Sequence, residues 1–451
     1  MNHTSHNQTH YNSDPQSTRA LLISIRTPNA NNEEIDRSLA ELGRLVATLG
    51  FEVYATQTQR QQSTKRLSVL GTGKLEELAR LTGELDEDVA DSLANIDGQG
   101  LDEFLGTASK NHANVVVFDC ELSPLQLRNV EDALGVKVFD RTGIIIEIFS
   151  RHASSKTAKL QVELARLNYL TPRVRREHAG DRQRHGGRGV GESAIEIEKR
   201  NIRDKQAQIR KDLKKVQDVM QEQRSGRLDT PCAALVGYTN AGKSSLMRAL
   251  TGSDVLVENK LFATLDTTVR ALMPLTQPRI LVSDTVGFIN KLPHDLVPAF
   301  HSTLQEARDA ALLLYVVDAG DKDFRAQLAV VQSVLEQIEL ADKDHLLLLN
   351  KVDCLAVDER ETLQLAYPDA MLISALDEAD VSRVHQAIVD AIAAQMITAS
   401  VNIPYAASAL IGDIHSKMLV LDESYDESGL RITLRARSAD LDRLNKLLQQ
   451  R

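Results

Sequence analysis

One eight-residue stretch, Gly237–Ser244 (GYTNAGKS), combines glycines with a lysine and a serine at fixed spacing. An apolar run, Ala233–Val236, precedes it and a helix-forming segment, Ser245–Leu250, follows it, which is the strand–loop–helix setting of a phosphate-binding loop. The glycines let the backbone wrap so that successive N–H groups point at phosphate oxygens, and the helix N-terminus adds partial positive charge. We expect Lys243 to bridge the terminal phosphates and Ser244 to coordinate magnesium. An accidental glycine-rich turn is the alternative.

A second motif lies downstream in the segment 279–287 (RILVSDTVG), which reads as a buried strand with an acidic end. Asp284 at the strand tip can hold a magnesium-bound water, and the Gly287 N–H can reach a γ-phosphate. The D-x-x-G pattern is weak alone, because many strand–helix turns share it. Its position after the glycine-rich loop strengthens it.

The segment 345–353 (HLLLLNKVD) carries base selectivity. Asp353 can accept two hydrogen bonds from guanine N1–H and N2–H₂, whereas adenine offers no such donor pair, so a mispaired base leaves buried polar groups unmet. Asn350 and Lys351 are expected to brace this loop and pack on the ring. A further strand, Ala370–Leu376, ends in small residues suited to a backbone N–H on guanine O6. Together these motifs predict guanine-nucleotide binding.

Phe288 occupies the position after Gly287, where many guanine-nucleotide hydrolases place a glutamine that orients the attacking water. A phenyl ring neither donates to nor accepts from that water. We therefore expect slow intrinsic hydrolysis and a partner that supplies the missing order. His294 or His301 is an alternative base, although a solvated histidine on a helix face is the default interpretation.

The segment 261–270 (LFATLDTTVR) lies where a first switch loop is expected. A threonine there can ligate magnesium through its hydroxyl and bond the γ-phosphate through its N–H. Chemistry alone does not choose among Thr264, Thr267 and Thr268.

Composition bounds the class of protein. The chain has 451 residues, 42% of them hydrophobic, which suits two to four domains. Cys120, Cys232 and Cys354 have no paired spacing, so we expect neither a disulfide framework nor a zinc site, and a reducing cytoplasm fits. The polar first residues do not resemble a signal peptide, and no uncharged apolar run approaches twenty residues. We expect a cytoplasmic monomer that is not inserted in a membrane.

Charge is unevenly distributed along the chain. The formal net charge is −10, yet residues 151–216 contain 18 Lys and Arg against 8 Asp and Glu, which leaves 35 against 55 elsewhere. Like-sign clustering of this kind is typical of a phosphate-rich partner. A solvated helical face with mixed charges is the alternative.

The organisation predicts five parts: a disordered tail over 1–18, an α/β domain over 19–150, a helical hairpin over 151–228, a nucleotide-binding domain over 229–398 and a small α+β domain over 399–451. In the second part, strand-like and helix-like pieces alternate, which favours a small parallel sheet covered by helices. The stretch Gly71–Lys74 precedes a helix there; a turn with a surface lysine is favoured over a second nucleotide site.

The hairpin is predicted from two apolar stripes, which indicate helices packed as an antiparallel coiled coil. The first stripe contains Leu160, Leu164 and Leu167, and the second contains Ile195, Ile202, Ile209 and Val216 with Leu213 and Met220. The loop between them is rich in glycine and arginine, and arginine offers planar phosphate contacts and stacks on unpaired bases. A functionless connector is the alternative. The candidate RNA-binding residues are Arg173, Arg175, Arg176, Arg182, Arg184 and Arg188.

In this order, the motifs at 237–244, 262–266, 284–287, 350–353 and 374–376 resemble those of the HflX family of GTPases. The Phe-Ala-Thr-Leu-Asp run and Phe288 are more specific to that family than the P-loop, and the resemblance extends upstream to Gly71–Lys74 and to the glycine-rich stretch 186–193, so it spans nearly the whole chain.

The resemblance implies an α/β fold in which a Ras-like P-loop GTPase domain is joined to an N-terminal α/β domain, a coiled-coil hairpin and a small C-terminal α+β domain. It also implies Mg²⁺ as cofactor, held by Ser244 and Thr264, with Lys243, Asp284 and Gly287 completing the catalytic set. The nucleotide (GTP or GDP) would contact Gly237, Tyr238, Thr239, Asn240, Ala241, Gly242, Lys243, Ser244, Phe262, Ala263, Thr264, Leu265, Asp266, Asp284, Thr285, Val286, Gly287, Asn350, Lys351, Val352, Asp353, Ser374, Ala375 and Leu376.

The partner implied by the resemblance is the ribosome, chiefly its large subunit and RNA. The expected function is GTP hydrolysis, stimulated by this partner, in ribosome splitting, rescue or recycling under stress. A GTPase of large-subunit assembly or RNA maturation would carry the same motifs. A non-hydrolysing RNA-binding scaffold is the alternative of another class, and the intact Lys243, Ser244, Asp284 and Asp353 argue against it.

Overall fold

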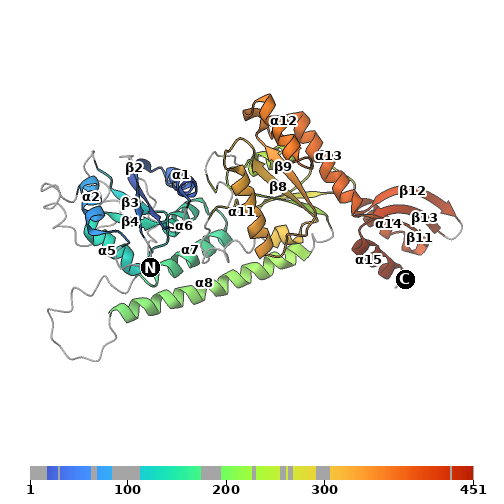
Figure 1. Ribbon diagram of the computed structural model, residues 1–451. Coiled ribbons are helices and arrows are strands. Elements are labelled where there is room, and N and C mark those ends of the chain that lie inside the picture. Colours follow the sequence, from blue (N-terminus) through green and yellow to red (C-terminus); the bar gives the residue numbers. More distant parts are fainter. Residues whose placement is uncertain are drawn as a thin grey trace. The chain divides into compact units, whose positions relative to one another are not determined.

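The chain forms two compact units, one from Met1–Arg151 and Arg166–Arg200 and the other from His152–Ala165 and Asn201–Arg451. The structure is a computed structural model (Figure 1) that describes residues 18–28, 31–61, 69–83, 112–173, 194–225, 230–253, 261–262, 268–290, 305–426 and 429–449.

The first unit contains a four-stranded, fully parallel sheet in the order β2-β1-β3-β4. Residues 20–25 of β1 are all buried, as expected for a strand covered on both faces. Leu21 and Ile23 belong to a core shared with α2 and α5, whereas Leu22 lies against Gly43 of α1. The strands are β1 (Arg19–Arg26), β2 (Glu52–Arg60), β3 (Val115–Phe118) and β4 (Lys137–Asp140); the helices are α1 (Asn32–Thr48), α2 (Thr72–Thr82), α5 (Pro124–Leu134) and α6 (Arg141–His152). The expected parallel sheet is confirmed.

The Gly71–Lys74 stretch forms the start of α2, with Gly71 as its N-cap. Lys74 Nζ lies 2.7 Å from Gln57 Oε1 and 2.8 Å from Glu77 Oε2. The ammonium is therefore engaged by neighbouring side chains, which favours the turn-and-lysine interpretation of this stretch.

Charged side chains are buried at the carboxyl ends of β3 and β4. Arg141 pairs with Asp119 at 2.9 Å and with Glu41, and all three side chains are almost fully buried. Buried charges are tolerated only when paired in this way, and removing one partner leaves the other uncompensated.

Asp140 at the end of β4 fixes the end of α7 (Lys156–Leu170). Tyr169 Oη donates to Asp140 Oδ1 at 2.8 Å, and Arg173 Nη2 lies 3.1 Å from Asp140 Oδ2. The Arg173 guanidinium also lies 3.3 Å from the centre of the Tyr169 ring. Burial, and then the Asp140 charge, raise the pKa of the Tyr169 phenol far above its usual range. Arg173 therefore has internal partners, unlike a side chain held out for RNA.

The long helix α8 (Ala194–Ser225) is drawn in green in Figure 1. Its buried positions have heptad spacing. Gln206, Ile209 and Leu213 are buried, and Ile202 and Val216 are half-buried, so successive positions are four and three residues apart. On α7 the buried positions are Thr157, Ala158, Gln161, Val162, Ala165 and Leu167, whereas Leu160 and Leu164 are half-buried. Lys205 of α8 lies 2.6 Å from Glu163 of α7. The two predicted helices are confirmed, and the predicted leucine stripe of α7 is buried at Leu167 and half-buried at the other two positions.

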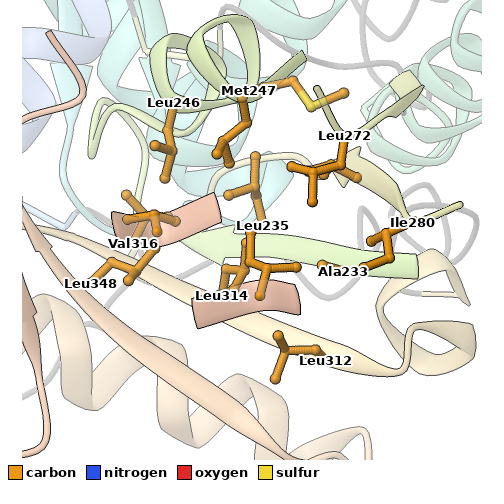
Figure 2. Packing of buried hydrophobic residues seen from close by; sticks show 14 of the residues in the cluster. Ala233, Leu235, Leu246, Met247, Leu272, Ile280, Leu312, Leu314, Val316 and Leu348 are labelled. Carbon is orange, nitrogen blue, oxygen red and sulfur yellow. The ribbon is translucent and has the colours of Figure 1, made fainter. Parts of the chain in front are cut away.

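The nucleotide-binding part contains a six-stranded sheet in the order β10-β9-β8-β5-β7-β6, in which only β6 is antiparallel to its neighbour. In Figure 2, Leu246 and Met247 of α9 lie over Leu235 of β5, and all three are fully buried. The strands are β5 (Cys232–Gly237), β6 (Thr268–Ala271), β7 (Leu281–Asp284), β8 (Leu312–Asp318), β9 (His345–Asn350) and β10 (Met371–Leu372); the helices are α9 (Lys243–Thr251), α11 (Phe324–Gln337), the 3₁₀ turn η3 (Val352–Cys354), α12 (Val357–Ala366) and α13 (Glu378–Ala394). The predicted α/β class is confirmed.

The last elements form a three-stranded antiparallel sheet in the order β11-β13-β12. Alternate residues Leu430, Ile432 and Leu434 face a core shared with two helices. The elements are β11 (Ile397–Ile403), η4 (Tyr405–Ala407), α14 (Leu410–Lys417), β12 (Leu419–Asp426), β13 (Gly429–Ala436) and α15 (Ser438–Gln449). β11 begins two residues before the predicted start at 399. Within the described ranges, no helix has the length and apolar character needed to cross a membrane.

Candidate nucleotide-binding site

The glycine-rich loop joins the end of β5 to the start of α9, and it depends on two glycines. A Cβ on Gly237 would lie 2.1 Å from the Val316 carbonyl oxygen, because β5 and β8 approach closely here. Gly242 has a φ of 93°, and a Cβ there would lie 2.2 Å from Asn350 Nδ2. Both positions exclude a side chain, so the loop backbone can wrap around a phosphate.

Lys243, the first residue of α9, is buried inside this loop. Its Nζ donates to the carbonyl oxygens of Tyr238 at 2.8 Å and Gly237 at 3.2 Å. Burial lowers the pKa of its ammonium to about 8, and the Asp284 carboxylate opposes that shift. Burial removes the water that would stabilise the charged ammonium. The negative charge of a polyphosphate bound here would stabilise the ammonium in place of that water.

The side chains of Ser244 and Asp284 are hydrogen-bonded to each other beside this loop. Ser244 Oγ donates to Asp284 Oδ2 at 2.9 Å, and Asp284, the last residue of β7, is fully buried. Hydroxyl and carboxylate oxygens are the donors that Mg²⁺ prefers, and it reaches most of its coordination through waters and phosphates. These two residues therefore fit a magnesium ion held next to a bound polyphosphate.

The segment after Asp284 is hydrogen-bonded to the glycine-rich loop. The Phe288 N–H donates to Gly237 O at 3.0 Å, the Thr239 N–H donates to Phe288 O at 2.9 Å, and the Asn290 N–H donates to Tyr238 Oη at 2.7 Å. Phe288 is only 4% exposed. Its side chain is thus part of the interior, and a phenyl ring has no group that could donate a hydrogen bond to a water or accept one from it.

Gly287 lies against the phosphate loop more closely than any side chain would allow. A Cβ on Gly287 would lie 2.7 Å from Thr239 Cα and 2.9 Å from Lys243 Nζ. The expected role of its N–H toward a γ-phosphate is compatible with this placement beside Lys243.

Asn350, at the end of β9, connects the two halves of the site. Its Nδ2 donates to Ala241 O at 2.9 Å, and its Oδ1 accepts from the Ala375 N–H at 3.0 Å. The side chain is almost fully buried. The loop-bracing role predicted for Asn350 agrees with these contacts.

Lys351 is held with a φ of 63°, and its Nζ lies 2.7 Å from Asp318 Oδ2. Asp318 ends β8 in the way that Asp284 ends β7, and our sequence interpretation missed it. An acidic residue at a strand end was the available signal.

Asp353 lies in η3 with its carboxylate exposed. A hydrogen bond from the Ser374 hydroxyl lowers the pKa of this carboxyl group, so it is ionised and able to accept hydrogen bonds at neutral pH. The Ser374 N–H is fixed by Asp380 Oδ2 at 2.7 Å. The Ala375 N–H is used by Asn350, so the amide that would contact guanine O6 stays a prediction.

Several predicted site residues fall outside the described part of the chain. Phe262 is described, with its ring buried, and Thr268 is the first residue of β6, paired with Asp284. The residues outside the description are Ala263, Thr264, Leu265, Asp266, Thr267, His294, His301, Arg175, Arg176, Arg182, Arg184 and Arg188.

The phosphate loop follows β5 and Asp353 follows β9, so both lie at the carboxyl end of the parallel strands, and Asn350 joins the phosphate loop to Ala375. A ligand that uses both ends must carry a polyphosphate and a guanine, which places the chain among the P-loop GTPases.

Comparison with known proteins specifies the family. A curated protein, the GTPase HflX of Gluconacetobacter diazotrophicus, is 47% identical over 444 residues, covering 96% of this chain and 98% of that protein. The GTPase HflX of Escherichia coli is 34% identical over 434 residues, covering 94% of each. The chain belongs to the HflX family of GTPases, and it is a GTP hydrolase.

Three family descriptions match successive parts of the chain: "GTP-binding GTPase N-terminal" at 36–97 and 90–150, "GTP-binding GTPase Middle Region" at 152–227, and "50S ribosome-binding GTPase" at 232–351. Among solved structures, a GTP-binding protein of Sulfolobus solfataricus in complex with GDP is similar, with 23% identity, a TM-score of 0.41, and coverage of 83% of this chain and 98% of that one.

Proposed function

We propose that this GTPase binds the large ribosomal subunit and that contact with the ribosome stimulates its hydrolysis of GTP, in ribosome splitting, rescue or recycling. The observation that carries the proposal is the position of Phe288: its ring is buried and its backbone is hydrogen-bonded to Gly237 and Thr239. In a Ras-like site, a glutamine at this position orients the attacking water. A buried phenyl ring at position 288 cannot do so, and a partner surface is therefore required for fast turnover.

The description "50S ribosome-binding GTPase", which matches 232–351, supports the choice of partner. The local charge of residues 151–216, 18 Lys and Arg against 8 Asp and Glu, supports a phosphate-rich surface. We assign RNA contact to Arg175, Arg176, Arg182, Arg184 and Arg188, and we remove Arg173 from this set because Asp140 and Tyr169 hold it internally.

Magnesium is the proposed cofactor, held by Ser244 and Thr264, with Asp284 placed to accept from a magnesium-bound water. When bound, it would neutralise charge that develops between the β- and γ-phosphates. The residues of this chain do the rest: the loop amides and Lys243 bind the phosphates, Gly287 contacts the γ-phosphate and Asp353 selects guanine. The five-part division of the chain at 18, 150, 228 and 398 is proposed with this assignment.

Sedimentation of ribosomes with the protein tests the proposal. We expect the protein to co-migrate with the large subunit in the presence of a non-hydrolysable GTP analogue and to dissociate with GDP. GTP turnover should rise at least about tenfold when ribosomes are added. Dissociation of 70S particles into subunits would support splitting.

Other results would select a different function. Stable binding to large-subunit precursors without any change in the subunit profile would favour a role in assembly. Absence of GTP turnover even with ribosomes would contradict the enzyme assignment and favour an RNA-binding scaffold.

A further inference from the structure

Thr239 has a side-chain hydroxyl that is buried at the phosphate end of the site. The residue is 6% exposed, and within the described ranges its Oγ1 has no hydrogen-bond partner. A buried hydroxyl without a partner costs folding free energy, so most native structures pair such groups. An uncompensated hydroxyl in a binding loop indicates that its partner belongs to the ligand.

The surroundings of Thr239 identify the part of the ligand involved. Thr239 Cγ2 and Lys243 Nζ each lie 2.9 Å from the position that a Cβ on Gly287 would occupy. Thr239, Lys243 and Gly287 are therefore neighbours at the end of the loop where the lysine ammonium and the Gly287 amide are expected to meet the γ-phosphate. The methyl branch of Thr239 lies against Gly287, and the hydroxyl on the same Cβ is buried close to an ammonium that attracts an anion.

The backbone of Thr239 is fixed independently of its side chain. Its N–H donates to Phe288 O at 2.9 Å, within the hydrogen bonds that hold the 288–290 segment to the loop. The Thr239 backbone is therefore fixed next to Phe288, whose buried ring supplies no polar group to the site.

We propose that the Thr239 hydroxyl donates a hydrogen bond to a γ-phosphate oxygen during hydrolysis and is a catalytic residue of this GTPase. The water oxygen forms a bond to the γ-phosphorus while the bond to the β–γ bridging oxygen breaks. The products are GDP and inorganic phosphate, and the proton from the water leaves with the phosphate. Thr239 keeps its own proton and stabilises negative charge on the transferring group.

The test compares Thr239→Val with Thr239→Ser. Valine has nearly the shape of threonine without the hydroxyl, whereas serine keeps the hydroxyl and loses the methyl group. Single-turnover GTP hydrolysis should slow by about a hundredfold in Thr239→Val and by less than about threefold in Thr239→Ser, since loss of one preorganised donor to a developing anion has a cost of that size. The affinity for GDP, which lacks the γ-phosphate, should change by less than about twofold in both.

The inference rests on GTP hydrolysis by this chain and is independent of the ribosome. Hydrolysis is therefore measured without ribosomes as well as with them, and the same rate loss is expected in both. A wild-type rate in Thr239→Val would overturn the proposal, as would equal losses in the valine and serine variants. Binding of GDP with aluminium fluoride, a mimic of the transferring phosphoryl group, gives a second readout: weaker binding by Thr239→Val alone is expected, and equal binding by all forms would also overturn it.

Discussion

The side chain of Asn350 donates to the carbonyl oxygen of Ala241 at 2.9 Å, although 109 positions separate the two residues in sequence. Its amide oxygen accepts from Ala375, so a single buried side chain joins the phosphate loop to both loops expected at the base. The phosphate and base ends of the site are consequently one hydrogen-bonded structure.

Replacement of Asn350 by alanine should weaken GDP and GTP alike. Two buried hydrogen bonds that hold the loops of the site in place are lost, so those loops must be ordered when the nucleotide binds, and we expect at least about a tenfold rise in both dissociation constants. Fluorescent-nucleotide titration measures the effect, with Gln386→Ala, on the surface of α13, as control. Unchanged affinity would show that the bridge is unimportant for binding.

Asp353→Asn should change which base is bound. An amide in place of the carboxylate can donate one hydrogen bond, which suits the C2 carbonyl of xanthine better than the amino group of guanine. We expect GDP affinity to fall at least about a hundredfold and xanthosine diphosphate to become the preferred ligand. Glu361→Gln on α12 is the matched control, because it removes an exposed carboxylate nearby. Retention of guanine preference would remove Asp353 from the base site.

Nucleotide binding should depend on pH through Lys243. In the free protein, burial lowers the pKa of its ammonium to about 8, and a bound phosphate raises that pKa because it favours the charged form. Below the lower pKa the lysine is protonated in both states, so affinity is constant. Above it, binding takes up a proton, and affinity falls by up to about tenfold per pH unit. Calorimetry near pH 8.5 in buffers of different ionisation enthalpy should detect this proton uptake; its absence would contradict the assignment.

Phe288→Gln should not restore a Ras-like intrinsic rate. The side chain at this position is buried and its backbone is hydrogen-bonded to the phosphate loop, so glutamine would be placed in the interior. We expect a free energy of unfolding lower by roughly 3 kcal/mol and no acceleration of single-turnover hydrolysis without a partner. Faster hydrolysis in this variant would show that position 288 reaches the water.

Arg173 and the other arginines should behave differently. Arg173→Ala removes the ion pair with Asp140 and should lower thermal stability while leaving the salt dependence of ribosome binding unchanged. Replacing Arg182, Arg184 and Arg188 together should leave thermal stability unchanged. The slope of log affinity against log salt should become shallower by about two, because each lost phosphate contact contributes about 0.7. Measurements of ribosome binding at several salt concentrations separate the two groups.

Sequence alone predicted the secondary structure around the site motifs, since each motif consists of neighbouring residues at fixed spacing. The strand before the loop, the helix after it and the acidic end of β7 all lie where apolar runs and glycines indicated. Contacts between distant segments were beyond reach. The sequence around Ala241 does not show that Asn350 will bond to it, because that contact depends on the order of the strands. The same holds for the contact of Lys351 with Asp318.

The apolar stripes predicted on α7 and α8 are buried to different degrees. On α8 the heptad spacing selected the seam, yet Gln206 fills one of its buried positions. On α7 Leu167 is buried and Leu160 and Leu164 are half-buried, while Ala158, Val162 and Ala165 are buried on the opposite side of the helix. The helix therefore has two buried sides, and the leucine spacing identified one of them.

The hydrogen bonds that hold Phe288 and Asn290 to Gly237, Thr239 and Tyr238 also affect how this enzyme can register its nucleotide. Residues 288–290 are already ordered, so binding costs no further backbone entropy there, a saving of about 1–2 kcal/mol per residue. A signal that reports loss of the γ-phosphate must therefore break these hydrogen bonds, begin beyond position 290, or come from the first switch loop expected at 261–270.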